Sequence, residues 1–344
     1  MAGLAAAAEA RRLGATPLVL EKLDRPGGSM RVSSGVIWRH RELERFEAEC
    51  PSGDRPLQRL LFERLDDDLR WLESLGAPVV TRETGNELTT GVRFDPESLT
   101  ATLVASAGDV RRSAPLRDLP DSTPVVLATG GFGADRDLLR EHVTPEADHL
   151  LVRAAPGSTG DGLRFGLAAG AATSAGLDEV YARAMPAPPA QVPPAGFVAL
   201  SQLYAAYAEV TNERGERHET TTWSEVDTAQ WMARQPRARA WFRVPELALG
   251  ERVRERSVGE MVEAAAAAGA PVRREEGHVT VETVAGVTTT LGGLAIDVHA
   301  RAAPGVFACG ADAGGLATGG YASGLAAALV FGRLAARAAL GESP

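Results

Sequence analysis

The chain has 344 residues and is 44% hydrophobic, which is enough for about two domains and a large core. Its formal net charge of −9 leaves no basic stripe for nucleic acid, and no apolar run approaches the length of a membrane span. Cys50 and Cys309 are its only cysteines and lie far apart, which excludes a disulfide framework and a cysteine-ligated metal site. The composition therefore favours an acidic cytoplasmic enzyme.

The N-terminal stretch has the order of a nucleotide-binding unit. Residues 2–13 are rich in helix formers, Gly14 predicts the helix end, and residues 16–20 predict a buried parallel strand that ends at Glu21. In such units the helix opens on the last glycine of G-x-G-x-x-G, and an acid about 20 positions later binds the ribose. Gly3 and Glu21 fit these two positions.

Three further segments have the composition of ligand-binding turns. Residues 25–35 form a loop of small residues after Glu21, in which backbone N–H groups can approach a phosphate or sugar closely. Residues 124–127 predict an apolar strand, and the Ala-Thr-Gly-Gly after it suits the ligand-binding end of a parallel sheet. Near the C-terminus, the apolar strand 304–310 and a glycine-rich turn precede a long apolar helix over 322–340.

A fourth glycine-rich loop, residues 156–162, precedes a helix predicted over 163–169. Asp161 or Thr159 can cap this helix, whose N-terminus would face a bound group. A well-capped surface helix explains the pattern equally well.

Other stretches predict structure rather than chemistry. The leucine spacing predicts a helix within residues 42–76, and residues 99–104 read as a strand-like piece between turns. Trp38 and His40 could face a ligand, but half-buried packing residues are the favoured interpretation.

Together with Glu21, these segments resemble the FAD-binding oxidoreductases of the fumarate reductase, succinate dehydrogenase and ketosteroid dehydrogenase superfamily. The resemblance implies an α/β fold with a discontinuous Rossmann-like FAD-binding domain, residues 1–133 and 286–344. An α+β substrate-capping domain, residues 134–285, would be inserted between these two parts.

The resemblance also implies non-covalent FAD, bound at the glycine-rich segments and at the N-terminus of the final helix, whose dipole favours negative charge on the reduced ring. The residues implied to bind FAD are Gly3, Glu21, Lys22, Gly27, Gly28, Ser29, Ser34, Gly35, Ala128, Thr129, Gly130, Gly131, Asp161, Gly310, Asp312, Gly320, Ser323, Gly324 and Leu325.

Departures from the family decide the expected chemistry. Fumarate reductases carry a His before the Thr of Thr-x-Gly-Gly and an Arg before the final helix, where this chain has Thr289 and Tyr321. A dicarboxylate substrate is therefore disfavoured. Tyr321 is similar to the ketosteroid dehydrogenase tyrosine that polarises a ketone and so acidifies the neighbouring C–H. We expect hydride transfer between flavin and a C–C bond next to a carbonyl or carboxylate.

The capping segment offers arginines as less specific candidates for an anion contact. Residues 212–219 resemble the family's Asn, Gly-x-Arg and Glu turn, to which Arg217 and Glu219 correspond, although an exposed charged hairpin explains them almost as well. Arg243 lies, with three later arginines, where fumarate reductases place a proton-delivering arginine. We expect Tyr321, Arg243 and Arg217 to contact a small-molecule substrate; the electron partner is open.

The first strand of the FAD-binding unit and two of its glycines would lie upstream of Met1. Either Met1 lies inside a longer natural protein, or the chain is a truncated member that binds FAD poorly. The intact later motifs favour the first explanation, because a gap beside a parallel sheet exposes unpaired backbone. The short segments before Pro124 and between Val258 and Thr288 favour the second.

Two alternatives belong to other functional classes. A degenerate, non-catalytic flavin-fold protein could act as a partner or scaffold. A nicotinamide-dependent oxidoreductase would also use Gly3 and Glu21, but it explains the N-terminal segment and not the C-terminal one.

Overall fold

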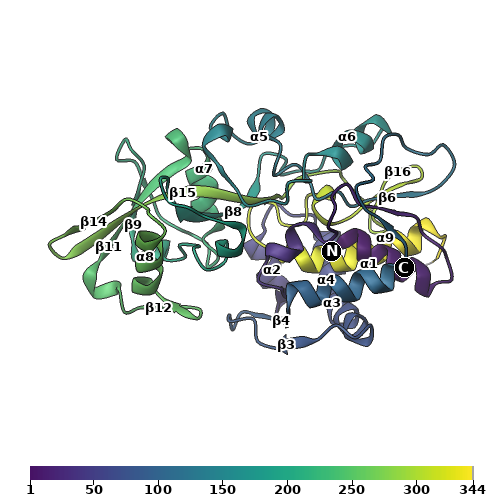
Figure 1. Cartoon of the computed structure of the whole chain (residues 1–344), viewed down its shortest axis with the longest axis horizontal. Coiled ribbons are helices and arrows are strands. Elements are labelled where there is room, and N and C mark those ends of the chain that lie inside the picture. The colour runs from purple at the N-terminus through teal and green to yellow at the C-terminus, as the bar shows by residue number, and fades with distance from the viewer. Residues whose placement is uncertain (343–344) are drawn as a thin grey trace. The chain divides into compact units, whose positions relative to one another are not determined.

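A computed structural model gives the fold and describes residues 1–342 (Figure 1). The chain divides into two compact units. Unit 1 comprises Met1–Ala134, Ala155–Leu177 and the chain from Thr290 onward; unit 2 comprises Asp135–Ala154 and Asp178–Thr289. The expected division placed 134–285 in one inserted segment, whereas here the loop and helix within 155–177 belong to unit 1.

Within residues 1–342, unit 1 is built from six α-helices and three small sheets. Its helices are α1 (Ala2–Arg12), α2 (Leu43–Glu49), α3 (Arg55–Ser74), α4 (Pro96–Ala107), α6 (Asp161–Ala168) and α9 (Gly324–Ala339), with the 3-10 turns η1 (Gly28–Val32) and η7 (Gly310–Asp312). Its strands are β1 (Val19–Leu20), β2 (Val36–His40), β3 (Val79–Thr81), β4 (Thr89–Phe94), β5 (Val110–Arg111), β6 (Val125–Leu127), β16 (Arg301–Ala303) and β17 (Val306–Ala308).

The sheets of unit 1 combine parallel and antiparallel pairing, in agreement with the predicted α/β class. Strand β1 pairs with β5 in parallel, β17 lies between parallel β6 and antiparallel β16, and β2, β4 and β3 form an antiparallel sheet. Helix α1 contacts both β1 and β6, and it packs against α4 and α9 to form much of the core. The predicted strand over 124–127 and the helix end at Gly14, with φ of +88°, are confirmed.

The predicted buried strand over 16–20 is shorter and more exposed than expected. Only Val19–Leu20 forms a strand, and Leu18 and Leu20 are 58% and 37% exposed. Successive side chains of a strand point to opposite faces, so Val19 packs against the core while Leu18 and Leu20 point away from it.

Two other predictions from local patterns differ from the structure, the first in its continuity and the second in the type of element. The expected helix within 42–76 is two helices, because Pro51 and Gly53 interrupt it and Asp54 starts α3 by accepting a hydrogen bond from Leu57 N at 3.0 Å. Residues 99–104 are helical. The Asp95 carboxylate caps α4 and Pro96 occupies its first turn, a start signal that the strand interpretation overlooked.

Unit 2 is a mostly antiparallel sheet with helices. Its strands are β7 (Leu151–Val152), β8 (Val180–Pro186), β9 (Glu209–Thr211), β10 (Arg217–His218), β11 (Arg239–Pro245), β12 (Arg252–Val253), β13 (Arg256–Ser257), β14 (Val272–Glu275) and β15 (His278–Thr290). Its helices are α5 (Arg136–His142), α7 (Val226–Ala233) and α8 (Val258–Ala267), with 3-10 turns η2 (Ala147–His149), η3 (Pro194–Gly196), η4 (Ala205–Tyr207), η5 (Pro236–Ala238) and η6 (Glu246–Ala248).

Strand β15 organises unit 2. The main sheet has the order β10-β9-β11-β15-β14, and β7 and β8 also pair with β15. Phe242 on β11 lies opposite Val281 on β15, and both are fully buried, so this face of the sheet forms the core of the unit.

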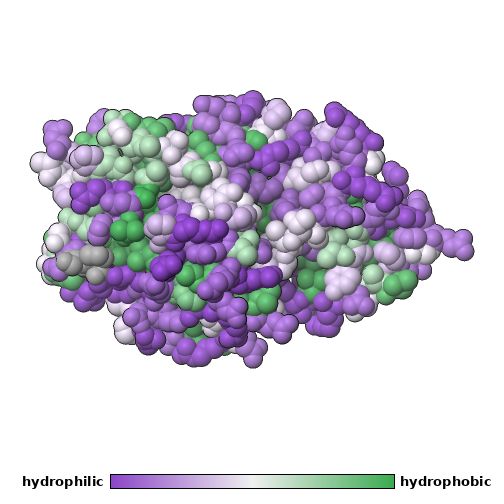
Figure 2. Space-filling view, turned by 180° about the vertical axis from the view of Figure 1, so that it is seen from behind, coloured by the Kyte–Doolittle hydropathy of each residue, from purple (hydrophilic) through white to green (hydrophobic). Residues whose placement is uncertain are grey.

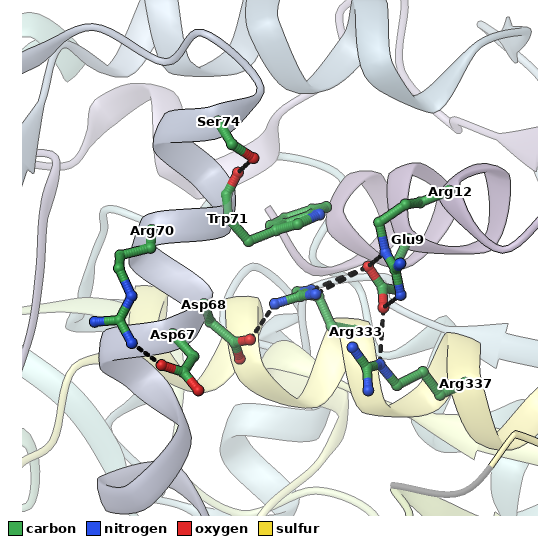
Figure 3. A network of polar contacts seen from close by, with 9 residues as sticks. All are labelled: Glu9, Arg12, Asp67, Asp68, Arg70, Trp71, Ser74, Arg333 and Arg337. Atoms are coloured by element: carbon green, nitrogen blue, oxygen red, sulfur yellow. Dashed lines mark hydrogen bonds and ion pairs between the residues drawn. The ribbon is translucent and has the colours of Figure 1, made fainter.

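A buried ionic network joins three helices of unit 1 (Figure 3). The fully buried Glu9 on α1 accepts hydrogen bonds from Arg12 at 2.8 Å, from Arg333 at 3.0 Å and from Arg337 at 2.7 Å. Burial by itself would raise the pKa of Glu9, but the three guanidinium groups lower it to about 2. The carboxylate therefore stays ionised inside the core.

Arg333 carries the network from α9 to α3. It donates to Asp68, and its guanidinium carbon lies 4.2 Å from the centroid of the Trp71 ring. Burial raises the pKa of Asp68 to about 6, because the bond from Arg333 does not fully compensate for desolvation. The two carboxylates on either side of Arg333 thus have pKa values shifted in opposite directions.

The molecular surface is mostly hydrophilic on the face shown in Figure 2, with apolar side chains in separate patches. Within residues 1–342, no helix is both long enough and apolar enough to cross a membrane.

Candidate flavin-binding site

Three glycine-rich segments of unit 1 meet at one buried carboxylate. Asp312, which is 1% exposed, accepts hydrogen bonds from Thr129 N, from Thr129 Oγ1 at 3.0 Å and from Gly131 N at 3.0 Å. Gly162 N donates to Thr129 Oγ1 at 2.9 Å. A Cβ added to Gly162 would lie 2.5 Å from the Asp312 carboxyl carbon, so only glycine allows this approach. The structure therefore brings the turns at 129–131, 160–162 and 310–312 together.

Asp312 has a structural task that the sequence did not reveal. Burial raises the pKa of its carboxyl group, although the Thr129 and Gly131 donors oppose the shift. Because both carboxylate oxygens accept bonds from residues 129–131, Asp312 fixes the shape of this turn. Its expected contact with the ribityl chain stays a prediction.

The end of β1 is tied to the fourth glycine-rich loop. Lys22 Nζ donates to Asp161 Oδ2 at 2.8 Å and to Thr159 Oγ1. The expectation that Asp161 or Thr159 caps α6 is wrong, because the N-cap is Gly160, with φ of +77° and no side-chain cap. These two side chains bind Lys22 instead. Glu21 lies beside them, and its Oε1 accepts from Leu23 N at 2.9 Å.

The small-residue loop after Glu21 packs closely and borders open space. Gly27 has φ of +114°, and a Cβ there would lie 2.9 Å from side-chain atoms of Arg31 and Thr100. By contrast, a Cβ on the half-buried Gly28 would meet no atom within 4 Å. Ser29 Oγ accepts from Ala155 N at 3.0 Å.

Two more loop residues differ in their surroundings. Ser34 is exposed, whereas a Cβ on Gly35 would lie 2.0 Å from Phe94 O. The glycine at position 35 is thus required by the fold itself.

Two of the predicted glycines shape the start of α1. A Cβ on Gly3 of α1 would lie 3.2 Å from Ala128 Cβ, and one on Gly310 would lie 3.0 Å from Ala2 Cβ. These positions therefore need small residues where α1 packs against the ends of β6 and β17.

The N-terminus of α9 is capped and accessible. Ser323 Oγ accepts from Ala326 N at 3.3 Å, while Gly324 is exposed and an added Cβ there would meet no atom within 4 Å. Leu325 is partly buried and packs against the core. The start of this sixteen-residue helix can thus receive an anionic or electron-rich group.

Tyr321 stands just before this helix, against an aromatic side chain. Its ring centroid lies 5.3 Å from that of Trp38, at an interplanar angle of 58°. The Trp38 ring is in turn 5.3 Å from that of His40, in an edge-on arrangement. Trp38 and His40 are both buried, as the packing interpretation expected.

The two expected arginines lie together on the sheet of unit 2. Arg217 pairs with Glu209 at 2.5 Å, and Arg243 lies 3.5 Å from the same carboxylate and 3.2 Å from His278 Nδ1. Their side chains are 73% and 43% exposed. Glu219 is exposed as well, so this hairpin is a charged surface cluster, and its contact with substrate stays a prediction.

Gln58 shapes the site and was missed at the sequence level. Gln58 Nε2 donates to Cys50 O at 2.9 Å and to Leu316 O at 3.1 Å, which ties the turn before α3 to the turn before Tyr321. No local pattern marks Gln58, because it acts on a partner 258 positions away. The sequence named Trp38 as a ligand-facing or packing candidate, but no local pattern showed that it contacts Tyr321 and Ser323.

A discontinuous α/β unit with glycine-rich turns at its strand ends defines the class of nucleotide-binding folds. The chain matches the family of FAD binding domains over residues 1–121 and 118–325, and it therefore belongs to that family. A search of curated proteins found no match.

Solved structures of flavoenzymes share the fold. A 3-ketosteroid-Δ4-(5α)-dehydrogenase from Rhodococcus jostii RHA1 matches with a TM-score of 0.71 and 19% identity, over 98% of this chain and 94% of that chain. A flavocytochrome c3 fumarate reductase matches with a TM-score of 0.69 and 21% identity, over 99% and 76%. A 3-ketosteroid Δ1-dehydrogenase from Sterolibacterium denitrificans gives 0.68 and 14%, over 98% and 97%.

The predicted family, the α/β fold class and FAD as cofactor are thereby confirmed. The predicted class of oxidoreductase agrees with the names of these neighbours. The family assignment also favours FAD over the nicotinamide alternative.

The described residues fit FAD at three points. Glu21 is half-buried at the end of β1, the half-buried Gly28 borders open space, and Gly324 leaves the start of α9 accessible. An acid for the ribose, a small-residue path for the diphosphate and a helix N-terminus for the electron-rich ring are what this cofactor requires.

Proposed function

We propose that this protein is an FAD-dependent oxidoreductase that transfers hydride between the flavin and a C–C bond next to a carbonyl or carboxylate. The observation that carries the proposal is the position of Tyr321, which lies beside Trp38 and immediately before the accessible start of α9. The convergence of the predicted flavin segments at Asp312 supports it.

Tyr321 is assigned the proton-handling work. A phenol that donates a hydrogen bond to a substrate carbonyl stabilises the negative charge that develops on the oxygen and so acidifies the adjacent C–H. When bound, FAD supplies the hydride acceptor or donor. Arg217 and Arg243 are the proposed anion contacts, supported by their shared place at Glu209.

The proposed substrate is a small carbonyl compound rather than a dicarboxylate, because Thr289 and Tyr321 replace the basic pair expected for the latter. The cytoplasm is the proposed compartment, supported by the two buried cysteines, which are not joined in a disulfide within residues 1–342.

The test begins with flavin loading. Visible absorption is compared between the printed chain and a form extended upstream in the gene. A form that binds FAD is then mixed anaerobically with ketones and their unsaturated counterparts, and flavin reduction or reoxidation is followed. Protein of both forms that never retains FAD would favour the non-catalytic alternative.

On an identified substrate, Tyr321→Phe is expected to lower kcat/KM by about a hundredfold, the usual cost of removing one donor to a developing oxyanion. Tyr207→Phe is the matched control, since Tyr207 is an exposed tyrosine in unit 2. Unchanged turnover in Tyr321→Phe would remove Tyr321 from the mechanism.

A further inference from the structure

Four rings form a continuous row that starts at Tyr321. Tyr321 packs on Trp38 and Trp38 on His40, each at 5.3 Å between ring centroids; His40 stacks on Phe46 at 5.4 Å. His40 and Phe46 are 1% exposed. The row therefore runs from the partly buried Tyr321 into the core of unit 1.

Strand β2 fixes the tryptophan in this row. Residues 38 and 40 are two apart on β2 and project from the same face. Trp38 lies opposite Gly91 on β4, where an added Cβ would be 2.6 Å from Trp38 Cα and 2.9 Å from its Cβ. The close backbone approach at Gly91 leaves Trp38 little freedom to withdraw from Tyr321.

The turn that carries Tyr321 is held along its length. Asp54 N donates to Gly315 O at 2.9 Å, and Gln58 Nε2 donates to Leu316 O at 3.1 Å. A Cβ on Gly320 would lie 1.7 Å from Glu49 O, so the backbone next to Tyr321 sits directly on the end of α2. Trp38 N donates to Ser323 Oγ at 3.4 Å on the other side.

We propose that Trp38 is a positioning residue for Tyr321: its indole restricts the phenol ring to one orientation on a turn whose backbone is already fixed. This inference rests on the proposed function, in which the Tyr321 hydroxyl meets a substrate carbonyl. Since a misplacement of about 1 Å can cost a hundredfold in rate, a wall against one face of the ring has a direct catalytic consequence.

His40 packs against Trp38 as the next ring of the row. Its imidazole contacts both Trp38 and Phe46, and it also interacts with the Tyr321 backbone. Burial lowers the pKa of His40 to about 4, so the ring is neutral at ordinary pH and can stay buried between aromatic rings. The support therefore does not change with pH in the neutral range.

The first test observes the Tyr321 ring directly. The chain has four tyrosines, so protein grown with 3-fluorotyrosine gives few ¹⁹F resonances, and Tyr321→Phe identifies the one from Tyr321. In the parent we expect a broad or doubled signal from a ring that flips slowly. Trp38→Leu should convert it to one narrow line.

Trp241→Leu is the matched control, because Trp241 is also a tryptophan on a strand, but it is partly buried and belongs to unit 2. It should leave the Tyr321 signal unchanged. A narrow single line in the parent, or no response to Trp38→Leu, would overturn the proposal. If Trp38→Leu does not fold, Trp38→Phe tests the same point with a smaller ring.

The second test separates the positioning effect from the proposed function. Trp38→Leu should lower kcat at least tenfold with a smaller change in KM, and Trp38→Leu combined with Tyr321→Phe should be no slower than Tyr321→Phe alone. Full kcat in Trp38→Leu, or losses that multiply in the double variant, would overturn the proposal.

If Tyr321→Phe itself keeps full turnover, the tyrosine's part in the proposed function fails, and the ¹⁹F spectra alone decide whether Trp38 orients the ring.

His40→Leu should narrow the Tyr321 line less than Trp38→Leu does, because it removes support for Trp38 and not the contact itself. A larger effect of His40→Leu would assign the positioning to His40 and overturn the proposal for Trp38.

Discussion

Two of the buried carboxylates of unit 1, those of Glu9 and Asp312, are satisfied in different ways. Glu9 is surrounded by the guanidinium groups of Arg12, Arg333 and Arg337, and its pKa falls to about 2. Asp312 accepts backbone N–H and hydroxyl donors from residues 129–131, and burial raises its pKa. The first arrangement cancels a charge between helices, whereas the second uses a carboxylate to shape a glycine-rich turn.

The difference separates the scaffold from the candidate site. An ionised carboxylate among three arginines contributes mainly to holding α1, α3 and α9 together (Figure 3). A carboxylate held by backbone donors places the amide groups of the turn instead, which is what a bound cofactor would contact.

The largest expected effect comes from breaking the charge balance around Glu9. Glu9→Gln removes the buried anion of Arg12 and Arg337 and leaves Arg333 with Asp68 alone, and it should lower the free energy of unfolding by about 3 to 5 kcal/mol. Urea denaturation measures this loss of unfolding free energy. Asp67→Asn is the control, because Asp67 pairs with Arg70 in solvent and should change stability by less than about 1 kcal/mol. Equal losses in the two variants would contradict the charge-balance interpretation.

The pH dependence sharpens the contrast within the Glu9 network. Burial raises the pKa of Asp68 to about 6 from an ordinary value of 3.8. The folded state then binds the proton more tightly than the unfolded state, so the unfolding free energy contributed by Asp68 rises as the pH falls from 7 to about 4, by about 2 kcal/mol. Glu9 has the opposite sign, and its contribution is lost only as the pH falls from about 4.5 towards 2.

Urea denaturation of the parent and of Asp68→Asn at several pH values tests this difference. The parent should gain stability relative to the variant on acidification from pH 7 to about 4. A constant difference between the two proteins would show that Arg333 keeps Asp68 ionised throughout.

The other carboxylate is tested by Asp312→Asn. The amide offers one acceptor oxygen in place of two, so one donor of residues 129–131 loses its partner, at a cost of about 1 to 2 kcal/mol in stability. FAD affinity should fall about tenfold or more, because the turn amides shift; flavin fluorescence titration measures this. Asp297→Asn is the control, since exposed Asp297 also accepts backbone N–H bonds, from His299 and Arg301. Unaltered FAD affinity in Asp312→Asn would separate this turn from the cofactor.

The smallest expected effect concerns the ion pair of Lys22 and Asp161, whose side chains are both partly exposed. Lys22→Met removes the bond to Asp161 and should cost at most about 1 kcal/mol, since both side chains contact solvent. FAD affinity should fall more than stability does, because the loop 156–162 loses its tie to Glu21. Arg25→Met, which removes the exposed pair with Glu97, should affect neither quantity. A similar loss of FAD affinity in Arg25→Met would indicate a general charge effect.

Local sequence signals determined the elements that hold the candidate site. The alanine-rich α1, the apolar β6 and the long α9 follow from residue composition and periodicity, and glycines mark the turns at 129–131 and 310. Such signals involve residues within about four positions of one another, and the sequence therefore carries them openly. The missed helix start at Asp95-Pro96 was also a local signal, and it was misread.

The tertiary structure alone decided which of these segments work together. The bonds from Thr129 to Asp312, from Lys22 to Asp161 and from Trp38 to Ser323 join residues 183, 139 and 285 positions apart. The packing of helices and strands selects which distant residues meet. The sequence around a buried carboxylate or ring does not show which distant residue it will contact. Local sequence thus marked the glycine turns, and their resemblance to known motifs indicated the family, while long-range packing determined that Asp312 shapes a turn and that Trp38 faces Tyr321.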